Sequence, residues 1–422
     1  MRLTVDQLAP FGEDGGLVHF VDTAFLMDDP ERVGVAVSGG GDSMALLHVA
    51  QARAQLAGTT LEAVTVDHGL RAQAADEAAM VAAYCASHDI PHSVLEWDGA
   101  AATGNIAAAG RDARYDLIAN WAKMRGVGGV LLGHTLDDIA ETFLMRLARK
   151  AGVDGLAMMD TQFERHGMRW SRPFWQQSRT DLRDYLRRHN VPWVDDPTND
   201  DETHDRPKAR KALDTLDGLG ITREVLKSVA MNMSGARSAL EHYTIEEARR
   251  VVREDRGDVI INTRALPPVP PEINRRLLSA ALQYVGSQPY APRSEAMVEL
   301  DCGLAQAGKH TLAGCLVTSD QREIRVTREF NAVKAIAAPL GANWDRRWQV
   351  LGPVGGELSV RALGEHIKDI PDWRETGLPR SSLIASPAVF KGDWLIAAPV
   401  AGLQNGFSAR IVADFESFLL SR

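Results

Sequence analysis

A glycine-rich segment, Ser38-Gly39-Gly40-Gly41-Asp42-Ser43, follows a strand-like run and opens a helix-like one. Glycines in such a turn let backbone N–H groups converge on an anion, and the positive end of the helix adds to the attraction. Ser38 and Ser43 offer hydroxyl donors, and Asp42 is suited to orienting the turn or helping to hold magnesium. The segment lacks the Gly-Lys-Ser/Thr ending of the kinase and GTPase P-loop, so it predicts a phosphate site of another type. The alternative is a tight turn without a ligand.

Two further polar segments follow strand-like runs. One runs from Val66 to Arg71 and contains Asp67 and His68, and the other runs from Gly133 to Thr142. The second has four polar side chains at spacings of three and four, most of them on one side of a helix: His134, Asp137, Asp138 and Glu141. Helix capping explains either segment alone, because acids favour a helix N-terminus. Three polar strand ends in one sheet favour a ligand site.

Several arginines have a spacing that suits anions. Arg111 and Arg114 lie one helical turn apart, which fits phosphate or carboxylate recognition, although Asp112 and Asp116 are also near enough to pair with them. Between Glu164 and Arg188 there are seven arginines and three acids. This segment is either a phosphate-binding face or a solvated helix face with pairs along the helix.

An acidic turn from Asp195 to Asp201 is followed by Arg206, Lys208 and Arg210 at every second position. In an extended chain this spacing points three cations to one side, whereas in a helix it does not. The simpler interpretation is a solvated linker.

The elements that must position these residues alternate between β-rich and alanine-rich helical runs. Strands are expected at 33–37, 61–66, 92–96 and 130–132, and helices at 43–55, 74–88, 106–124 and 136–149. Such alternation implies parallel strands with crossover helices. The sequence therefore predicts an α/β fold with an open, doubly wound parallel sheet, whose ligands bind at the carboxyl ends of the strands.

The second half has a different pattern. Helices are expected at 223–254 and 271–284, separated by a proline-rich segment, and short strand-like runs begin near residue 309. We therefore expect a nucleotide-binding catalytic domain at 1–215, a mainly helical domain at 216–335 and a small α+β domain at 336–422.

Composition excludes several classes of protein. With 422 residues, 45% hydrophobic and 24% charged, the chain is long enough for two or three domains with their own cores. The net charge of −9 argues against a generally basic coat for nucleic acids. Three scattered cysteines suggest reduced thiols, and neither a signal peptide nor a membrane span is expected. We interpret the protein as cytoplasmic.

Taken together, the motifs resemble those of the tRNA(Ile)-lysidine synthetase family, within the PP-loop ATP-pyrophosphatase superfamily. SGGGDS at 38–43 carries the resemblance to the superfamily. The resemblance to the family rests on segments that occur in the expected order: VDHGLR at 66–71, GNIAAAGRDARY at 104–115, GHTLDDIAET at 133–142, RPF at 172–174 and DDPTNDD at 195–201.

The resemblance implies a reaction and its substrates. ATP, expected with Mg²⁺, would adenylylate the C2 oxygen of the first anticodon cytidine in a CAU-anticodon tRNA(Ile), and free L-lysine would then displace AMP to give lysidine. The resemblance is compatible with a homodimer. We expect no membrane partner, and the metal ligands stay unknown.

The same resemblance implies roles for individual residues. Asp42, His134 and Asp137 would be catalytic, and Asp137, Asp138 and Glu141 are candidates for holding lysine. ATP would be bound by Ser38, Gly39, Gly40, Gly41, Asp42, Ser43, Arg111 and Arg114. Candidates for contacting tRNA are Arg172, Arg179, Arg183, Arg187, Arg188, Arg206, Lys208 and Arg210.

Some positions depart from the family, and two alternative functions stay open. Thr135 stands where a second histidine is common, Ile139 where glutamine is common, and Pro207 where asparagine is usual. Sulfur transfer is disfavoured because no paired cysteines lie near the motifs. The alternatives are a PP-loop enzyme that adenylylates a small metabolite and a catalytically inactive tRNA-binding module.

Overall fold

The computed structural model describes residues 2–24, 30–67, 73–97, 106–195, 205–265, 267–304, 308–320, 322–353 and 356–421. The chain divides into two compact units, Met1–Arg237 and Ser238–Arg422. Each unit has its own sheets and its own buried core.

The first unit is built on a six-stranded sheet with the order β3-β2-β1-β4-β6-β5. Its strands are β1 (Arg32–Ala36), β2 (Thr60–Asp67), β3 (His92–Glu96), β4 (Gly129–Leu132), β5 (Gln162–Arg165) and β6 (Met168–Ser171). All neighbouring pairs are parallel except β5 and β6, which form an antiparallel hairpin at one edge.

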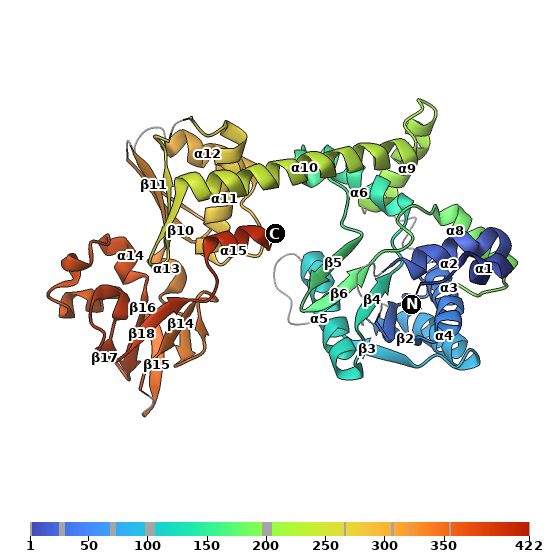
Figure 1. Ribbon diagram of the computed structural model, residues 1–422, viewed down its shortest axis with the longest axis horizontal. Helices are drawn as coiled ribbons and strands as arrows, with labels where there is room; N and C mark the ends of the chain where they lie inside the picture. Colours follow the sequence, from blue (N-terminus) through green and yellow to red (C-terminus); the bar gives the residue numbers. More distant parts are fainter. Residues whose placement is uncertain are drawn as a thin grey trace. The chain divides into compact units, whose positions relative to one another are not determined.

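Helices cover both faces of this sheet (Figure 1). Alternate residues of β4 point to opposite faces, so Leu131 joins a core with α2, α3, α4 and α8, while Val130 and Leu132 join a core with α5. The helices of the unit are α1 (Val5–Leu8), η1 (Ala9–Asp14), α2 (Gly15–Asp22), α3 (Gly41–Ala57), α4 (Gln73–Ser87), α5 (Ile106–Arg125), α6 (Leu136–Ala148), α7 (Val153–Leu156), α8 (Arg179–Arg188) and α9 (Asp205–Asp217). This layout confirms the predicted doubly wound parallel sheet.

A long helix, α10 (Arg223–Val251), continues from the first unit into the second. The sequence predicted that it would extend to residue 254, but β7 (Val252–Asp255) begins directly after Val251. The turn Arg256-Gly257, with both residues at positive φ, pairs β7 with β8 (Asp258–Asn262) as an antiparallel hairpin. Pairing with β8 therefore overrides the helical pattern in these last residues.

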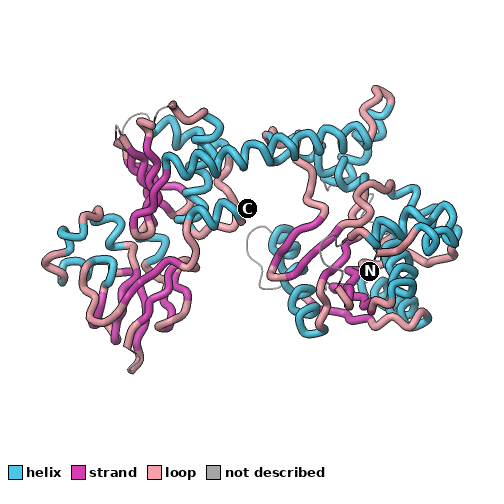
Figure 2. The backbone as a smooth tube through the Cα atoms, viewed as in Figure 1, coloured by secondary structure: helices cyan, strands magenta, loops and turns pink. Residues whose placement is uncertain are grey.

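The second unit contains three antiparallel sheets, drawn in magenta in Figure 2. A five-stranded sheet has the order β7-β8-β11-β10-β9, a four-stranded sheet the order β12-β15-β16-β17, and a three-stranded sheet the order β13-β14-β18. The remaining strands are β9 (Lys309–Leu312), β10 (Cys315–Ser319), β11 (Glu323–Arg328), β12 (Ala337–Pro339), β13 (Asn343–Trp344), β14 (Trp348–Leu351), β15 (Leu358–Ala362), β16 (Pro387–Lys391), β17 (Trp394–Ala397) and β18 (Ser408–Ile411).

Further helices complete the second unit. They are α11 (Pro271–Gly286), α12 (Ser294–Leu304), α13 (Phe330–Val333), η4 (Gly364–Asp369), η5 (Trp373–Thr376), α14 (Arg380–Ile384), η6 (Pro399–Ala401) and α15 (Phe415–Leu420). Within the described ranges, no helix is both long and apolar enough to cross a membrane.

Candidate active site

The candidate site lies where the strand order of the parallel sheet reverses. From β1, the chain continues through β2 and β3 towards one edge, whereas β4 and β6 lie on the other side of β1. The carboxyl ends of β1 and β4 therefore lie at the switch point of the sheet, where open α/β proteins bind their ligands. The turn at residues 38–43 follows β1, and the segment from Gly133 follows β4.

Close packing joins these two segments. A Cβ atom at Gly133 would lie 3.0 Å from Ser43 Cα and 3.1 Å from the Asp42 carbonyl carbon and oxygen. Only a glycine allows the end of β4 to approach the turn so closely. As a result, His134 and the first turn of α6 lie beside the start of α3.

Hydroxyl groups hold the turn in shape. Ser43 Oγ donates to the Gly40 carbonyl oxygen at 2.9 Å and accepts from the Ser38 backbone N–H at 3.1 Å, while Gly39 adopts a φ of 83°. The helix α3 starts after Gly40 without a side-chain cap, so its first N–H groups are free of such a partner. In many α/β proteins, a helix that starts in this way after a glycine-rich turn binds phosphate groups.

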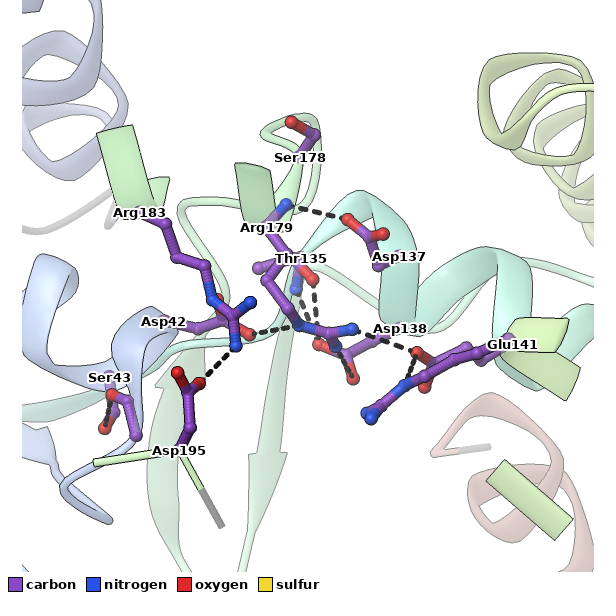
Figure 3. A network of polar contacts seen from close by, with 12 residues as sticks. Asp42, Ser43, Thr135, Asp137, Asp138, Glu141, Ser178, Arg179, Arg183 and Asp195 are labelled. Carbon is purple, nitrogen blue, oxygen red and sulfur yellow. Dashed lines mark hydrogen bonds and ion pairs between the residues drawn. The ribbon is translucent and has the colours of Figure 1, made fainter. Parts of the chain in front are cut away.

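Arg179 connects the turn to α6 (Figure 3). Its Nε donates to Asp42 Oδ2 at 3.2 Å and its Nη1 to Glu141 Oε1 at 3.2 Å, while Nη2 lies 3.7 Å from Asp138 Oδ1. Packing of α8 on α3 places Arg179 here, and Ser178 caps α8 by accepting from the Asp181 backbone N–H. One guanidinium thus lies among three carboxylates that come from two separate motifs.

Asp137 has a partner for each of its oxygens. Oδ2 accepts from the Arg179 backbone N–H at 2.7 Å, and Oδ1 accepts from Arg223 Nε at 2.9 Å. Arg223, in the first turn of α10, also contacts Asp214 at 3.0 Å. The buried Asp137 carboxylate therefore joins α6, α8 and α10.

Glu141 is fully buried and is surrounded by positive charge. Arg210 Nε donates to its Oε1 at 2.6 Å, and Arg206 Nε lies 3.9 Å from its Oε2. In the described part of the chain, Glu141 Oε2 and Asp42 Oδ1 are buried acceptors without a hydrogen-bond partner. Buried oxygens of this kind usually have a partner, so two unsatisfied ones in one site are typical of a ligand site.

The environment changes the pKa values of the acidic groups. Burial, opposed by Arg179 and reinforced by the negative charge of Asp138, raises the pKa of Asp42 to about 6. Burial by itself would also raise the pKa of Asp138, but His134, Arg206 and Arg179 hold that pKa below its usual range. Asp138 is therefore ionised at neutral pH, whereas Asp42 exchanges its proton at a pH just below neutral.

His134 lies next to these carboxylates and contacts an arginine. Arg172 Nε donates to His134 Nδ1 at 3.3 Å. Burial lowers the pKa of His134 to about 4. The negative charge of Asp138 by itself would raise this pKa, whereas the positive charges of Arg172, Arg111 and Arg206 lower it further. The imidazole is therefore neutral at neutral pH.

The other predicted residues occupy several environments. Arg111, Arg114 and Lys208 are exposed. Arg183 pairs with Asp195, Arg187 with Asp184, and Arg188 with both Glu13 and Asp14. Residues 206–210 are helical, so Arg206 and Arg210 share the face towards Glu141, and the extended arrangement that would align all three cations is not present.

Some predicted residues lie outside the described ranges: His68 and Arg71, Gly104 and Asn105, and residues 196–201. Conversely, Arg223 was not predicted from the sequence as a site residue. It lies 86 positions from Asp137, and no spacing pattern connects the two residues. Among the described residues, no group of three or more His, Cys, Asp or Glu side chains is arranged to hold a metal ion by itself.

Comparison with known proteins identifies the family. The model of a family described as "PP-loop domain" matches residues 17–215. The tRNA(Ile)-lysidine synthase of Ruegeria pomeroyi is 44% identical over 96% of this chain and 97% of its own length. The chain belongs to the tRNA(Ile)-lysidine synthase family. A second member, from Wolbachia pipientis wMel, is 32% identical over 87% of this chain and 88% of its own length.

Membership in the tRNA(Ile)-lysidine synthase family confirms the resemblance seen in the motifs, and the similarity extends through both compact units. The protein is therefore an enzyme of this type, and its PP-loop domain implies that it uses ATP. Among solved structures, the U34-tRNA thiolase NcsA from Methanococcus maripaludis with its [4Fe-4S] cluster is similar over 52% of this chain and 77% of that chain, with 14% identity and a TM-score of 0.44.

Proposed function

We propose that this enzyme joins the ε-amine of free lysine to C2 of the first anticodon cytidine in tRNA(Ile) with a CAU anticodon. One observation carries the proposal: in a chain similar to tRNA(Ile)-lysidine synthases along almost its whole length, Arg179 connects a glycine-rich turn to an acidic helix start at the switch point of the sheet. A small-metabolite enzyme does not account for similarity to tRNA(Ile)-lysidine synthases through both units, and the assay of turnover below separates the inactive tRNA-binding module.

In the first step, the C2 oxygen of cytidine attacks the α-phosphorus of ATP and pyrophosphate leaves. The turn at 38–43 and the uncapped start of α3 would hold the phosphates by backbone N–H groups. Arg111 and Arg114 are exposed on α5 and would bind phosphate oxygens. Their positive charge favours the product, because negative charge accumulates on the leaving pyrophosphate.

Magnesium is expected to accompany ATP, and Asp42 is the residue best suited to it. Its Oδ1 is buried without a hydrogen-bond partner among the described residues, and its carboxylate titrates close to neutrality. Magnesium is commonly held by one or two carboxylates together with substrate phosphates, so a complete protein cage is not needed. Bound magnesium would neutralise phosphate charge, and its positive charge would keep Asp42 ionised.

In the second step, the lysine amine attacks C2, gives up its proton to a carboxylate, and AMP leaves with the former C2 oxygen. The candidates that hold the ammonium and accept the proton are Asp137, Asp138 and Glu141. Glu141 is favoured, because its Oε2 lacks a hydrogen-bond partner while both oxygens of Asp137 are occupied by Arg179 and Arg223. Asp137 would then keep α6 and α10 in place around the reacting groups.

The tRNA substrate needs positive charge outside this site. The exposed Arg187 and Lys208 are the clearest candidates, together with Arg206 at the edge of the acidic cluster. Arg179, Arg183, Arg188 and Arg210 have acidic partners within the protein and would contact tRNA only by sharing or exchanging them. Because ATP, lysine and tRNA are cytoplasmic, we expect the enzyme to work there.

The adenylylation step can be tested without lysine. Incubation with unmodified tRNA(Ile) transcript, Mg²⁺ and ATP labelled in the α-phosphate should transfer label to the tRNA, and later addition of lysine should release labelled AMP. A transcript with uridine at the first anticodon position is the control and should gain no label. Labelling of a small metabolite instead of tRNA, or no labelling by folded protein that binds ATP, would refute the proposal.

A further inference from the structure

The hydrogen bond between Arg172 and His134 restricts what the imidazole can do. Arg172 Nε donates to His134 Nδ1 at 3.3 Å. A guanidinium carries donors only, so Nδ1 must be the acceptor. In a neutral imidazole the proton then resides on Nε2, because the hydrogen bond at one nitrogen decides the tautomer.

Arg172 is itself fixed by three other contacts. Its Nη1 donates to the backbone carbonyl oxygen of Asp160, and its Nη2 lies 3.4 Å from the hydroxyl of Tyr115. The guanidinium lies over the ring of Phe163, 4.3 Å from the ring centroid. These contacts leave Nε as the group that faces His134, so the orientation of the donor is set before a substrate binds.

Burial disfavours a second proton on the His134 ring, and the positive charges of three arginines add to this effect. Asp138 on α6 is the negative neighbour and favours that proton, while the positive neighbours are Arg111 on α5, Arg206 on α9 and Arg172 directly after β6. Asp138 Oδ2 already accepts from the backbone N–H and the hydroxyl of Thr135, at 2.9 and 3.1 Å. Among the described residues, no carboxylate accepts a hydrogen bond from the ring, which an imidazolium would need for stabilisation.

We infer that His134 acts as a neutral donor, through Nε2–H, to a phosphoryl oxygen of the adenylylated cytidine, and that Arg172 is a positioning residue that fixes this tautomer. This inference rests on the proposed function. His134 adjoins Gly133, which packs against the glycine-rich turn, and its arginine neighbours suit an anionic oxygen. The imidazole therefore stabilises charge on AMP as it leaves and does not accept the proton of lysine.

Nitrogen NMR of the full-length protein, with label in its histidines only, tests the tautomer directly. The His134 signals are assigned by their loss in His134→Gln. At neutral pH we expect a pyridine-type signal for Nδ1 and a pyrrole-type signal for Nε2. A proton on Nδ1, or on both nitrogens, overturns the inference. This measurement needs no turnover, so its failure is distinct from failure of the proposed function.

Two substitutions separate the nitrogens in the reaction. The amide nitrogen of His134→Gln lies near the position of Nε2, whereas that of His134→Asn lies near the position of Nδ1. We expect His134→Asn to lose on the order of 100-fold more turnover than His134→Gln, because only glutamine keeps a donor near the position of Nε2. Equal losses in both variants, or retention by His134→Asn alone, would count against the Nε2 donor.

Arg172→Gln tests the positioning role through an NMR titration of His134. Removing the positive neighbour should raise the pKa of His134. In a double variant with His134→Gln, Arg172→Gln should cause little additional loss of turnover. The matched control is Arg165→Gln, on the same hairpin, where the arginine lies 4.6 Å over the Tyr115 ring and pairs with Asp112. An unchanged His134 tautomer and pKa in Arg172→Gln would reduce Arg172 to a structural residue.

Discussion

At the scale of single residues, Asp42 has an environment that opposes its charge. The same carboxylate that would assist magnesium is largely removed from solvent and lies near Asp138, and its pKa is raised to about 6. Functional sites often keep groups that destabilise the fold because the reaction needs them. Asp42 is therefore a residue at which stability and activity should respond in opposite directions.

We expect Asp42→Asn to increase the free energy of unfolding at pH 7.5 by about 1–3 kcal/mol, since one pKa unit corresponds to about 1.4 kcal/mol. A raised pKa in the folded state means that the stability of the wild type falls as the pH rises from about 4 to about 6. The gain should therefore disappear below about pH 4. Urea unfolding at pH 7.5 and pH 4 measures it, with Asp184→Asn, an exposed acid paired with Arg187, as control. A less stable Asp42→Asn protein at pH 7.5 would contradict this expectation.

Asp137→Asn keeps the shape of the side chain but removes its charge and turns one acceptor into a donor. That donor would face either the Arg179 backbone N–H or Arg223 Nε, both of which also donate. We expect ATP binding to persist and lysidine formation to be lost, together with about 1–3 kcal/mol of stability. Nucleotide binding, product formation and urea unfolding measured on one preparation decide the matter. Unchanged product formation would remove Asp137 from the mechanism.

The grouping of Asp138 and Glu141 was predictable from the sequence, because a spacing of three puts them on one side of α6, and His134 directly precedes the N-cap of that helix. The position of Arg179 among the carboxylates was not predictable. It reaches Asp42 from 137 positions away, and only the packing of α8 on α3 brings the two together. Sequence periodicity specifies neighbours within an element but not across elements.

At the scale of elements, the parallel sheet follows from its buried, β-branched strands and their crossover helices. The hairpin of β5 and β6 was not predicted, because each strand has only 4 residues, too few for a clear periodicity, and the strands include Arg165 and Arg169. The hairpin matters for the site, since Arg172 follows β6 directly.

The close approach of β4 to the glycine-rich turn can be tested by Gly133→Ala. The new Cβ would meet backbone atoms of Asp42 and Ser43 at 3.0–3.1 Å, and backbone cannot give way as a flexible side chain does. We expect a loss of about 1–3 kcal/mol of stability and weaker ATP binding. Gly235→Ala on α10 is the matched control, because nothing lies within 4 Å of its Cβ and alanine favours a helix. If both variants bind ATP like the wild type, the close approach does not shape the nucleotide site.

At the scale of the whole molecule, a protein with a net charge of −9 must bind a polyanion through local patches. The first unit offers such a patch at the end of α8, but its two last arginines differ. Arg187 forms an ion pair with Asp184 on its own helix and lies 5.9 Å from the centroid of the Trp193 ring, whereas Arg188 connects α8 to Glu13 and Asp14. Replacing both together would mix tRNA binding with stability.

We therefore expect Arg187→Ala to weaken tRNA binding and to reduce the slope of log affinity against log salt by up to about 1, since each phosphate contact contributes about that much. Arg275→Ala in the second unit, where Arg275 pairs with Glu272, is the control for a general change in charge. Binding isotherms over a series of salt concentrations give both slopes. An unchanged slope for Arg187→Ala would show that this end of α8 does not contact the phosphates of tRNA.

We conclude that this enzyme forms lysidine on tRNA(Ile). The most direct measurement is the incorporation of labelled lysine into an unmodified CAU-anticodon tRNA(Ile) transcript with ATP and magnesium, leaving out each component in turn. We expect label in the tRNA only when all components are present, and located at the first anticodon cytidine after nuclease digestion. No label in the tRNA, from folded protein that binds ATP, would contradict the claim.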